Sequence, residues 1–185
     1  MSQQKLTSFF QKSAKIIPSV LPPPTTSRPE FFEPIAKPCN FQCPETDITP
    51  SYCMMFDGCS KGNPGPAGAG AVIYANNYEI WSRAIYVGNH ETNNLAEYTG
   101  MLLGLNEAVR LKIRVLTVKG DSEVVIKQMM GKYKVKSENL LDIYQQAKDL
   151  EKHFDKIDYI HVYRHLNARA DALSNEGLAK VVYRK

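Results

Sequence analysis

The sequence predicts an α/β fold over residues 52–185: a five-stranded mixed sheet flanked by helices. Three consecutive segments rich in β-branched and aromatic residues predict an antiparallel strand meander. After them the spacing of the apolar residues changes to a helical period, and helical segments then alternate with two more strands. A meander followed by this alternation is typical of a mixed sheet with helices packed on it.

The three strands of the predicted meander cover residues 51–58, 67–77 and 78–88. Asn76 and Asn77 stand between the second and third strands, and an asparagine pair suits the left-handed backbone of a tight hairpin turn. The first strand ends in an acid, Asp57, directly before a loop rich in glycine and proline.

The first predicted helix covers residues 92–112, where leucine and valine recur at helical spacing. Thr92 or Asn93 is the expected N-cap, because a short polar side chain accepts a hydrogen bond from a free amide of the first turn. The remaining elements are expected in the order strand, helix, helix, strand, helix, at residues 114–120, 121–130, 137–153, 156–164 and 168–180.

Residues 1–51 differ in composition from the rest of the chain. Nine of the eleven prolines and none of the eleven glycines lie before residue 51. Proline lacks the amide donor that a helix or sheet needs, so this segment is expected to be a disordered tail with an extended linker at 21–38. No stretch is apolar enough to span a membrane, and the N-terminus lacks the basic-then-apolar order of a secretory signal. We therefore expect an intracellular protein.

The four cysteines are Cys39, Cys43, Cys53 and Cys59. No histidine stands at a customary zinc-ligand spacing from them, and Cys53 falls inside a predicted strand. Disulfides are rare in a reducing compartment, so free thiols are the favoured interpretation over a structural zinc site.

Four acids stand where predicted strands end or predicted helices begin: Asp57, Glu97, Asp121 and Asp171. Such positions meet at one edge of an α/β sheet, and clustered carboxylates repel unless a cation neutralises them. Oxygen ligands without histidine or cysteine suit two Mg²⁺ ions, with Mn²⁺ as the alternative, and such a pair promotes phosphodiester hydrolysis. Each acid also has a structural interpretation: Asp121 as a helix cap and Asp171 as a first-turn acid.

Four sequence blocks resemble those of type 1 ribonuclease H. They are FDGCSKGNPGPAGAG, TNNLAEYTGMLLGL, VKGDSEVVIKQM and RHLNARADALSNEGL, and they span most of residues 52–180. The resemblance implies a ribonuclease H-like fold and a nuclease that uses two Mg²⁺ ions to cut the RNA strand of an RNA–DNA hybrid, leaving 5′-phosphate and 3′-hydroxyl ends. It also places Asp57, Glu97, Asp121 and Asp171 on the four metal-binding carboxylates of the family.

The resemblance further implies a set of residues that contact the hybrid. These are Gly58, Ser60, Asn63, Thr92, Asn93 and Asn94. Uncharged donors and acceptors suit phosphate and the 2′-hydroxyl group that distinguishes RNA from DNA. The glycines after Asp57 are expected to permit tight turns and the close approach of a nucleic-acid backbone. The alternatives are an ordinary hairpin loop for this segment and a helix cap for residues 92–94.

The segment before the last helix departs from the pattern of many family members, which carry a histidine on a longer loop there. Arg164 and His165 precede Asp171 by seven and six residues, which resembles the shorter-loop branch of the family with an arginine at this place. We expect Arg164 to assist catalysis, because a guanidinium group holds a phosphate oxygen bidentately. His165 is the alternative, since its proton moves near neutral pH.

Three lysines lie between two predicted helices and are expected either to contact the DNA strand or to form a solvated turn: Lys132, Lys134 and Lys136. Two other functional classes stay open, namely a non-catalytic hybrid-binding protein and a nuclease for another duplex. The presence of all four acids argues against the first.

The segment QQKLTSFF at residues 3–10 resembles the clamp-binding motif called a PIP box. Its characteristic positions are occupied by Gln3, Leu6, Phe9 and Phe10. One helical turn would gather the three apolar side chains into a plug for a groove. The implied partner is a sliding clamp of the proliferating cell nuclear antigen type, with the protein acting as a monomer in a nucleus or at a viral replication site.

Overall fold

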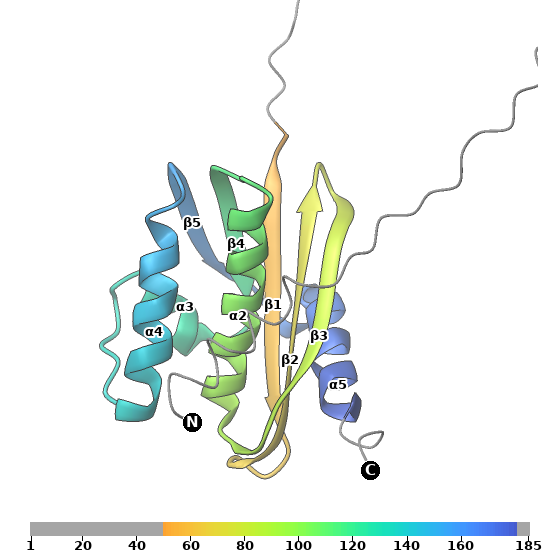
Figure 1. Ribbon diagram of the computed structural model, residues 1–185, viewed down its shortest axis with the longest axis vertical. Coiled ribbons are helices and arrows are strands. Elements are labelled where there is room, and N and C mark those ends of the chain that lie inside the picture. Colours follow the sequence, from red (N-terminus) through yellow and green to blue (C-terminus); the bar gives the residue numbers. More distant parts are fainter. Residues whose placement is uncertain (1–49, 181–185) are drawn as a thin grey trace, which may run out of the picture. The chain divides into compact units, whose positions relative to one another are not determined.

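The computed structural model describes residues 50–180, and its strands form a five-stranded mixed sheet (Figure 1). The strand order is β3-β2-β1-β4-β5. The first three strands pair antiparallel, whereas β4 and β5 run parallel to β1, so the predicted mixed sheet is confirmed. The strands are β1 Tyr52–Ser60, β2 Gly65–Ala75, β3 Tyr78–Glu91, β4 Val115–Gly120 and β5 Lys156–His161.

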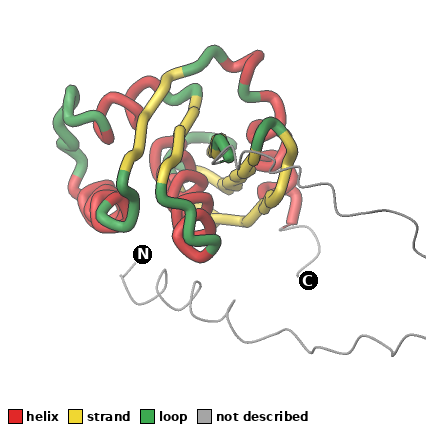
Figure 2. Tube along the Cα trace, turned by 90° about the horizontal axis from the view of Figure 1, so that it is seen from above, coloured by secondary structure: helices red, strands yellow, loops and turns green. Residues whose placement is uncertain are grey.

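Helices cover both faces of this sheet, as the view onto the strand ends shows (Figure 2). One face carries α2, which packs on β1 and on the neighbouring helix α4, while α5 packs on β2 and β3 on the other face. The helices are α2 Asn93–Arg110, α3 Glu123–Met129, α4 Glu138–Glu151 and α5 Ala168–Ala179, with a 3₁₀ turn, η1, at Arg164–Leu166.

The alternation of side chains along β1 divides its residues between the two faces. Met54 and Phe56 are fully buried, and Met54 lies against Gly104 of α2. Asp57, one position further, points to the opposite face, where Ser174 of α5 donates a hydrogen bond to it. The sheet therefore carries its central acid beneath α5, while the apolar side chains of β1 pack under α2.

Glycines allow both helices to approach the sheet closely. A Cβ atom at Gly70 would lie 2.4 Å from the Cβ of Leu173 in α5, and one at Gly58 would lie 2.1 Å from the backbone N of Glu97 in α2. These distances are far below a van der Waals contact. The expectation that Gly58 leaves space for a nucleic-acid backbone is therefore wrong on the side where a Cβ atom would stand. There α2 of the protein itself fills the space.

Several local expectations are confirmed and one is corrected. Asn76 and Asn77 adopt positive φ angles of 49° and 70° in the β2–β3 turn. Thr92 caps α2, because its Oγ1 accepts a hydrogen bond from Leu95 N at 3.3 Å. The predicted fifth strand at 156–164 is too long. It ends at His161, since after the bond from Val162 N to Gly120 O the chain turns into η1.

The expected tail and its PIP-box-like motif at 3–10 lie outside the described residues. Within the described part of the chain, Cys53 and Cys59 are free thiols, and the other two cysteines lie in the tail. None of the helices between residues 50 and 180 is both long and apolar enough to cross a bilayer.

Candidate active site and metal centre

Three acids from distant parts of the chain meet at one end of the sheet. Asp57 comes from β1, Glu97 from the second turn of α2, and Asp121 from the residue directly after β4. One carboxylate oxygen from each lies within 4.8 Å of the others. Asp57 and Glu97 are buried, with 5% of each residue exposed, while Asp121 is partly exposed. The arrangement offers three carboxylate oxygens that are close enough together to hold one metal ion.

The site raises the pKa values of its buried acids. Burial raises the pKa of Asp57 to about 6, and the charges of Asp121 and Asp171 add to the shift, while the Ser174 hydroxyl opposes it. Burial also raises the pKa of Glu97 well above its usual value, with the charges of Asp57 and Asp121 as further causes. Buried carboxylates held beside further negative charge repel one another, and a bound cation would relieve that repulsion.

The Glu97 carboxylate gives a direct test of whether a metal ion fits. A hydrogen bond from the Gly58 backbone amide opposes the rise in its pKa. Its Oε2 atom is buried and has no hydrogen-bond partner. A buried acceptor without a partner is costly, and a divalent cation would satisfy it. The donor set, which is carboxylate oxygen throughout, fits a hard cation such as Mg²⁺ or Mn²⁺.

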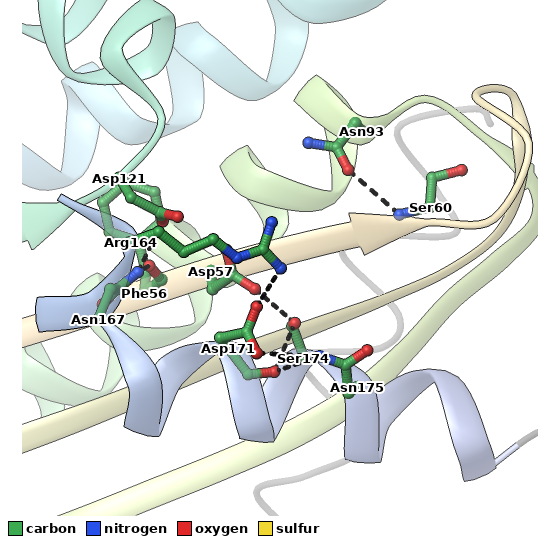
Figure 3. Close-up of polar contacts among 10 residues, drawn as sticks. All are labelled: Phe56, Asp57, Ser60, Asn93, Asp121, Arg164, Asn167, Asp171, Ser174 and Asn175. Carbon is green, nitrogen blue, oxygen red and sulfur yellow. Dashed lines mark hydrogen bonds and ion pairs between the residues drawn. The ribbon is translucent and has the colours of Figure 1, made fainter.

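Asp171 lies in the first turn of α5, beside this group, and has a different partner (Figure 3). The Arg164 guanidinium donates to Asp171 Oδ1, and this ion pair raises the pKa of Arg164. Among the described residues, the compact acidic group contains Asp57, Glu97 and Asp121 but not Asp171. The fourth expected carboxylate is therefore held at the rim of the site by an arginine.

The structure separates the two expected catalytic helpers. Arg164 reaches the acids, and its positive charge opposes the pKa rises of Asp57 and Glu97. His165 is exposed and stacks on Tyr163, with ring centroids 6.0 Å apart and planes 10° apart. A residue that the sequence did not single out, His161, lies beside Asp121, with its Nε2 atom 3.2 Å from the backbone oxygen of that residue.

Two further polar residues that sequence reasoning missed hold the acids in place (Figure 3). Asn167 Nδ2 donates to Asp121 Oδ1 at 2.7 Å, and Ser174 Oγ lies 2.5 Å from Asp57 Oδ2. Both residues belong to α5 or its N-cap and are almost completely buried. Their only sequence signal is the placement of Asn167 directly before a predicted helix and of Ser174 one turn after Asp171.

Most of the residues expected to contact a hybrid form one cluster between the β1–β2 loop and the start of α2. Asn93 Oδ1 accepts from Ser60 N at 3.2 Å, and Asn93 N donates to Asn63 Oδ1 at 2.8 Å. Thr92 caps α2, and Asn94 is exposed beside it. The backbone of Gly58 faces Glu97. The cluster presents uncharged polar groups next to the acids.

The three lysines of the α3–α4 segment, Lys132, Lys134 and Lys136, are all exposed. Tyr133 stands among them, with its ring 5.0 Å from the ammonium nitrogen of Lys127. This segment is therefore an exposed basic surface, the form that backbone contact with nucleic acid requires.

The chain matches known proteins over its described part. The family described as Reverse transcriptase-like matches residues 55–177. A bifunctional protein of Mycobacterium tuberculosis is 42% identical over 123 residues, which cover 66% of this chain. This chain spans 34% of that relative's length.

Shorter relatives match along nearly their whole length. A ribonuclease H of Pseudomonas fluorescens is 33% identical over 144 residues, covering 69% of this chain and 90% of the relative. The crystal structure of LC11-RNase H1 in complex with RNA/DNA hybrid superposes with a TM-score of 0.67 at 31% identity, covering 71% of this chain and 99% of that one. With the fold, the acidic group and these matches together, the chain belongs to the Reverse transcriptase-like family and is a ribonuclease H homologue.

Proposed function

We propose that this protein is an endoribonuclease that hydrolyses the RNA strand of RNA–DNA hybrids and leaves 5′-phosphate and 3′-hydroxyl ends. The observation that carries the proposal is the convergence of Asp57, Glu97 and Asp121 within 4.8 Å, with one Glu97 oxygen buried and unpaired. The relatives named ribonuclease H support the same reaction, and the solved relative bound to an RNA/DNA hybrid supports the substrate.

Each side chain of the site has a role in this proposal. Asp57, Glu97 and Asp121 would hold divalent ions, with Asp171 as the fourth ligand at the rim. Two such ions, when bound, supply an activated water and stabilise the leaving oxygen of the phosphodiester. Arg164 is exposed at the rim, where its guanidinium would hold a phosphate oxygen of the strand being cut.

The polar cluster beside the acids would distinguish the two strands. Asn63, Asn93 and Ser60 fix one another by hydrogen bonds, so their remaining donors and acceptors are presented in a rigid arrangement. Rigid polar groups recognise a 2′-hydroxyl better than mobile ones, because less conformational entropy is lost on binding. The lysines at 132, 134 and 136 would contact the backbone of the paired DNA strand.

Cleavage of an end-labelled hybrid in Mg²⁺ and in Mn²⁺ tests the reaction. The wild-type chain should cut the RNA strand of the hybrid and leave double-stranded RNA and double-stranded DNA intact. Asp121→Asn should abolish cutting, while Asp142→Asn, a change of the same kind on the exposed face of α4, should not. Hybrid binding without cutting by the wild type would make the chain a non-catalytic binding protein. Preferential cutting of another duplex would assign it a different substrate.

We further propose that a sliding clamp recruits the enzyme through residues 3–10, which would place it where DNA is copied. The support is the sequence alone: Gln3, Leu6, Phe9 and Phe10 occupy the characteristic positions of the motif, and a proline-rich segment follows. A tether of this kind raises the effective concentration of the nuclease on DNA without any change at its active site.

Retention on a clamp column tests the recruitment. Phe9→Ala/Phe10→Ala should lose retention, whereas the matched control Phe31→Ala/Phe32→Ala, which removes a second Phe-Phe pair from the same tail, should keep it. Equal retention of both double variants and the wild type would reject the motif. Cleavage of free hybrids should be the same in all three proteins.

A further inference from the structure

Asn167 joins the two strands that carry the acids at a point where they no longer pair with each other. The parallel ladder between β1 and β4 runs from Cys53–Thr117 to Met55–Lys119. It therefore stops two residues before Asp57 on one strand and two residues before Asp121 on the other. Beyond this point the two strands need another connection if their carboxylates are to keep a fixed separation.

The side-chain amide of Asn167 provides that connection. Its Nδ2 atom donates to the backbone oxygen of Phe56 at 2.8 Å and to Asp121 Oδ1 at 2.7 Å. Phe56 directly precedes Asp57, so one amide group contacts both strands beside their acids (Figure 3). The residue is 1% exposed, and it is held from a third element because it is the N-cap of α5.

The orientation of the amide follows from its two partners. Both groups that face Nδ2 are acceptors, and a reversed amide would place its oxygen against them. The observed orientation has an energetic cost, because it leaves Asn167 Oδ1 buried without a hydrogen-bond partner. The side chain also makes no cap bond to α5, although asparagine is well suited to one. The two donated hydrogen bonds are therefore what this residue supplies.

We infer that Asn167 is a positioning residue that holds the Asp121 carboxylate in register with Asp57 for binding a divalent ion. The inference rests on the proposed metal site and adds a residue to it that does not itself contact the ion. A hydrogen bond from an outer residue fixes the direction of a coordinating carboxylate, and losing such a partner typically weakens metal affinity by about 10–100-fold. Ser174 places a further hydrogen bond to one of the acids, Asp57, on the same helix.

Metal titration of Asn167→Asp tests this role. Aspartate keeps the size and the N-cap preference of asparagine but replaces the donor with an acceptor. The Mn²⁺ dissociation constant, measured by electron paramagnetic resonance without substrate, should rise about tenfold or more. The Mg²⁺ concentration for half-maximal cleavage should rise in parallel, while KM for the hybrid at saturating Mg²⁺ should change less than about twofold. The matched control is Asn106→Asp, whose amide donates to Leu102 O within α2; it should bind Mn²⁺ like the wild type.

The outcomes separate the possible failures. An Asn167→Asp protein that is less stable but binds Mn²⁺ within about twofold of the wild type would reduce Asn167 to a structural role and overturn the inference, even if the wild type cuts hybrids. A wild type that binds no divalent ion would instead overturn the proposed function. Should Asn167→Asp fail to fold, Asn167→Ser takes its place, because serine retains a donor and suits the N-cap. Its Mn²⁺ dissociation constant is then compared with that of the wild type, and weaker binding is expected.

Discussion

The guanidinium of Arg164 is paired with the carboxylate of Asp171, seven residues further along the chain. This pair links η1 to α5, and Asp171 lies outside the compact group formed by the other three acids. The positive charge of Arg164 also opposes the pKa rises of the two buried carboxylates. Arg164 is thus the cation that the described residues themselves place at the acidic site, and it stands on the side open to solvent.

Loss of Arg164 should therefore impair turnover more than loss of His165. Of Arg164 and His165, only Arg164 reaches the acids. Arg164→Ala should therefore lower kcat about tenfold or more, and Arg164→Lys should give an intermediate kcat. His165→Ala removes a ring stacked on Tyr163 and should stay within about threefold of the wild type. Steady-state cleavage of one hybrid by the three variants measures this. Equal kcat values for Arg164→Ala, His165→Ala and the wild type would contradict the assignment.

Neutralising Asp57 should stabilise the metal-free protein. The folded pKa of Asp57, about 6, lies above the usual value of 3.8, so the folded state binds the proton more tightly than the unfolded state does. Its favourable contribution is complete below pH 3.8 and is lost as the pH rises through 6. At pH 8 in a chelator, Asp57→Asn should raise the unfolding free energy by about 1–3 kcal/mol, measured by urea denaturation.

The same variant should lose the stabilisation that metal provides. Millimolar Mg²⁺ at pH 8 should raise the wild-type unfolding midpoint and leave that of Asp57→Asn nearly unchanged, since binding to the folded state alone shifts the equilibrium. Asp142→Asn on exposed α4 serves as the control and should follow the wild type in both conditions. A destabilised Asp57→Asn protein in chelator would disprove the electrostatic argument.

Removal of the Ser174 hydroxyl should move the acid limb of the pH profile to higher pH. The hydrogen bond from Ser174 lowers the pKa of Asp57, so Ser174→Ala should let that pKa rise further. A divalent ion binds the ionised carboxylate, so metal-dependent cleavage should begin at a higher pH than in the wild type. The pH dependence of kcat/KM at fixed Mg²⁺ shows the shift. A limb that stays in place or moves to lower pH would refute the role given to Ser174.

The contact between β2 and α5 should be intolerant of a single methyl group. At Gly70 a Cβ atom would lie 2.6 Å from the backbone N of Ser174, so Gly70→Ala should cost about 1–3 kcal/mol of unfolding free energy. Gly88→Ala is the matched control, because its Cβ would meet the movable side-chain end of Glu91. Urea denaturation should show a small change there. Equal losses of unfolding free energy in Gly70→Ala and Gly88→Ala would mean that the close approach of α5 is not the reason for glycine at position 70.

The sequence predicted the order of the elements and the acids because both depend on local patterns. The asparagine turn, the Thr92 cap and the alternation in β1 each depend on a few adjacent residues. The end of β5 was misplaced because the apolar alternation continues beyond His161, where the tertiary fold turns the chain into η1.

The contacts that fix the acids could not be predicted from the sequence. Asn167 reaches Asp121 across 46 positions, and Ser174 reaches Asp57 across 117. A pattern within a few adjacent residues cannot predict a hydrogen bond between residues so far apart in the sequence. The glycines were interpreted as space for a ligand because a missing side chain does not reveal what fills the space. Only the packed structure shows that α2 fills the space at Gly58 and that α5 fills it at Gly68 and Gly70.

The position of α5 along the chain places it after all three clustered acids, so α5 is synthesised last among the elements that build the proposed site. Asp57, Glu97 and Asp121 all precede residue 122, yet the hydrogen bonds that hold two of them come from Asn167 and Ser174, at the N-cap of the last helix that the structure describes and within that helix. During synthesis, a nascent chain that ends before residue 168 carries three acids without the helix that arranges them. Under the proposed function, chains truncated before residue 168 should not cleave RNA–DNA hybrids, and cleavage should begin only when α5 docks.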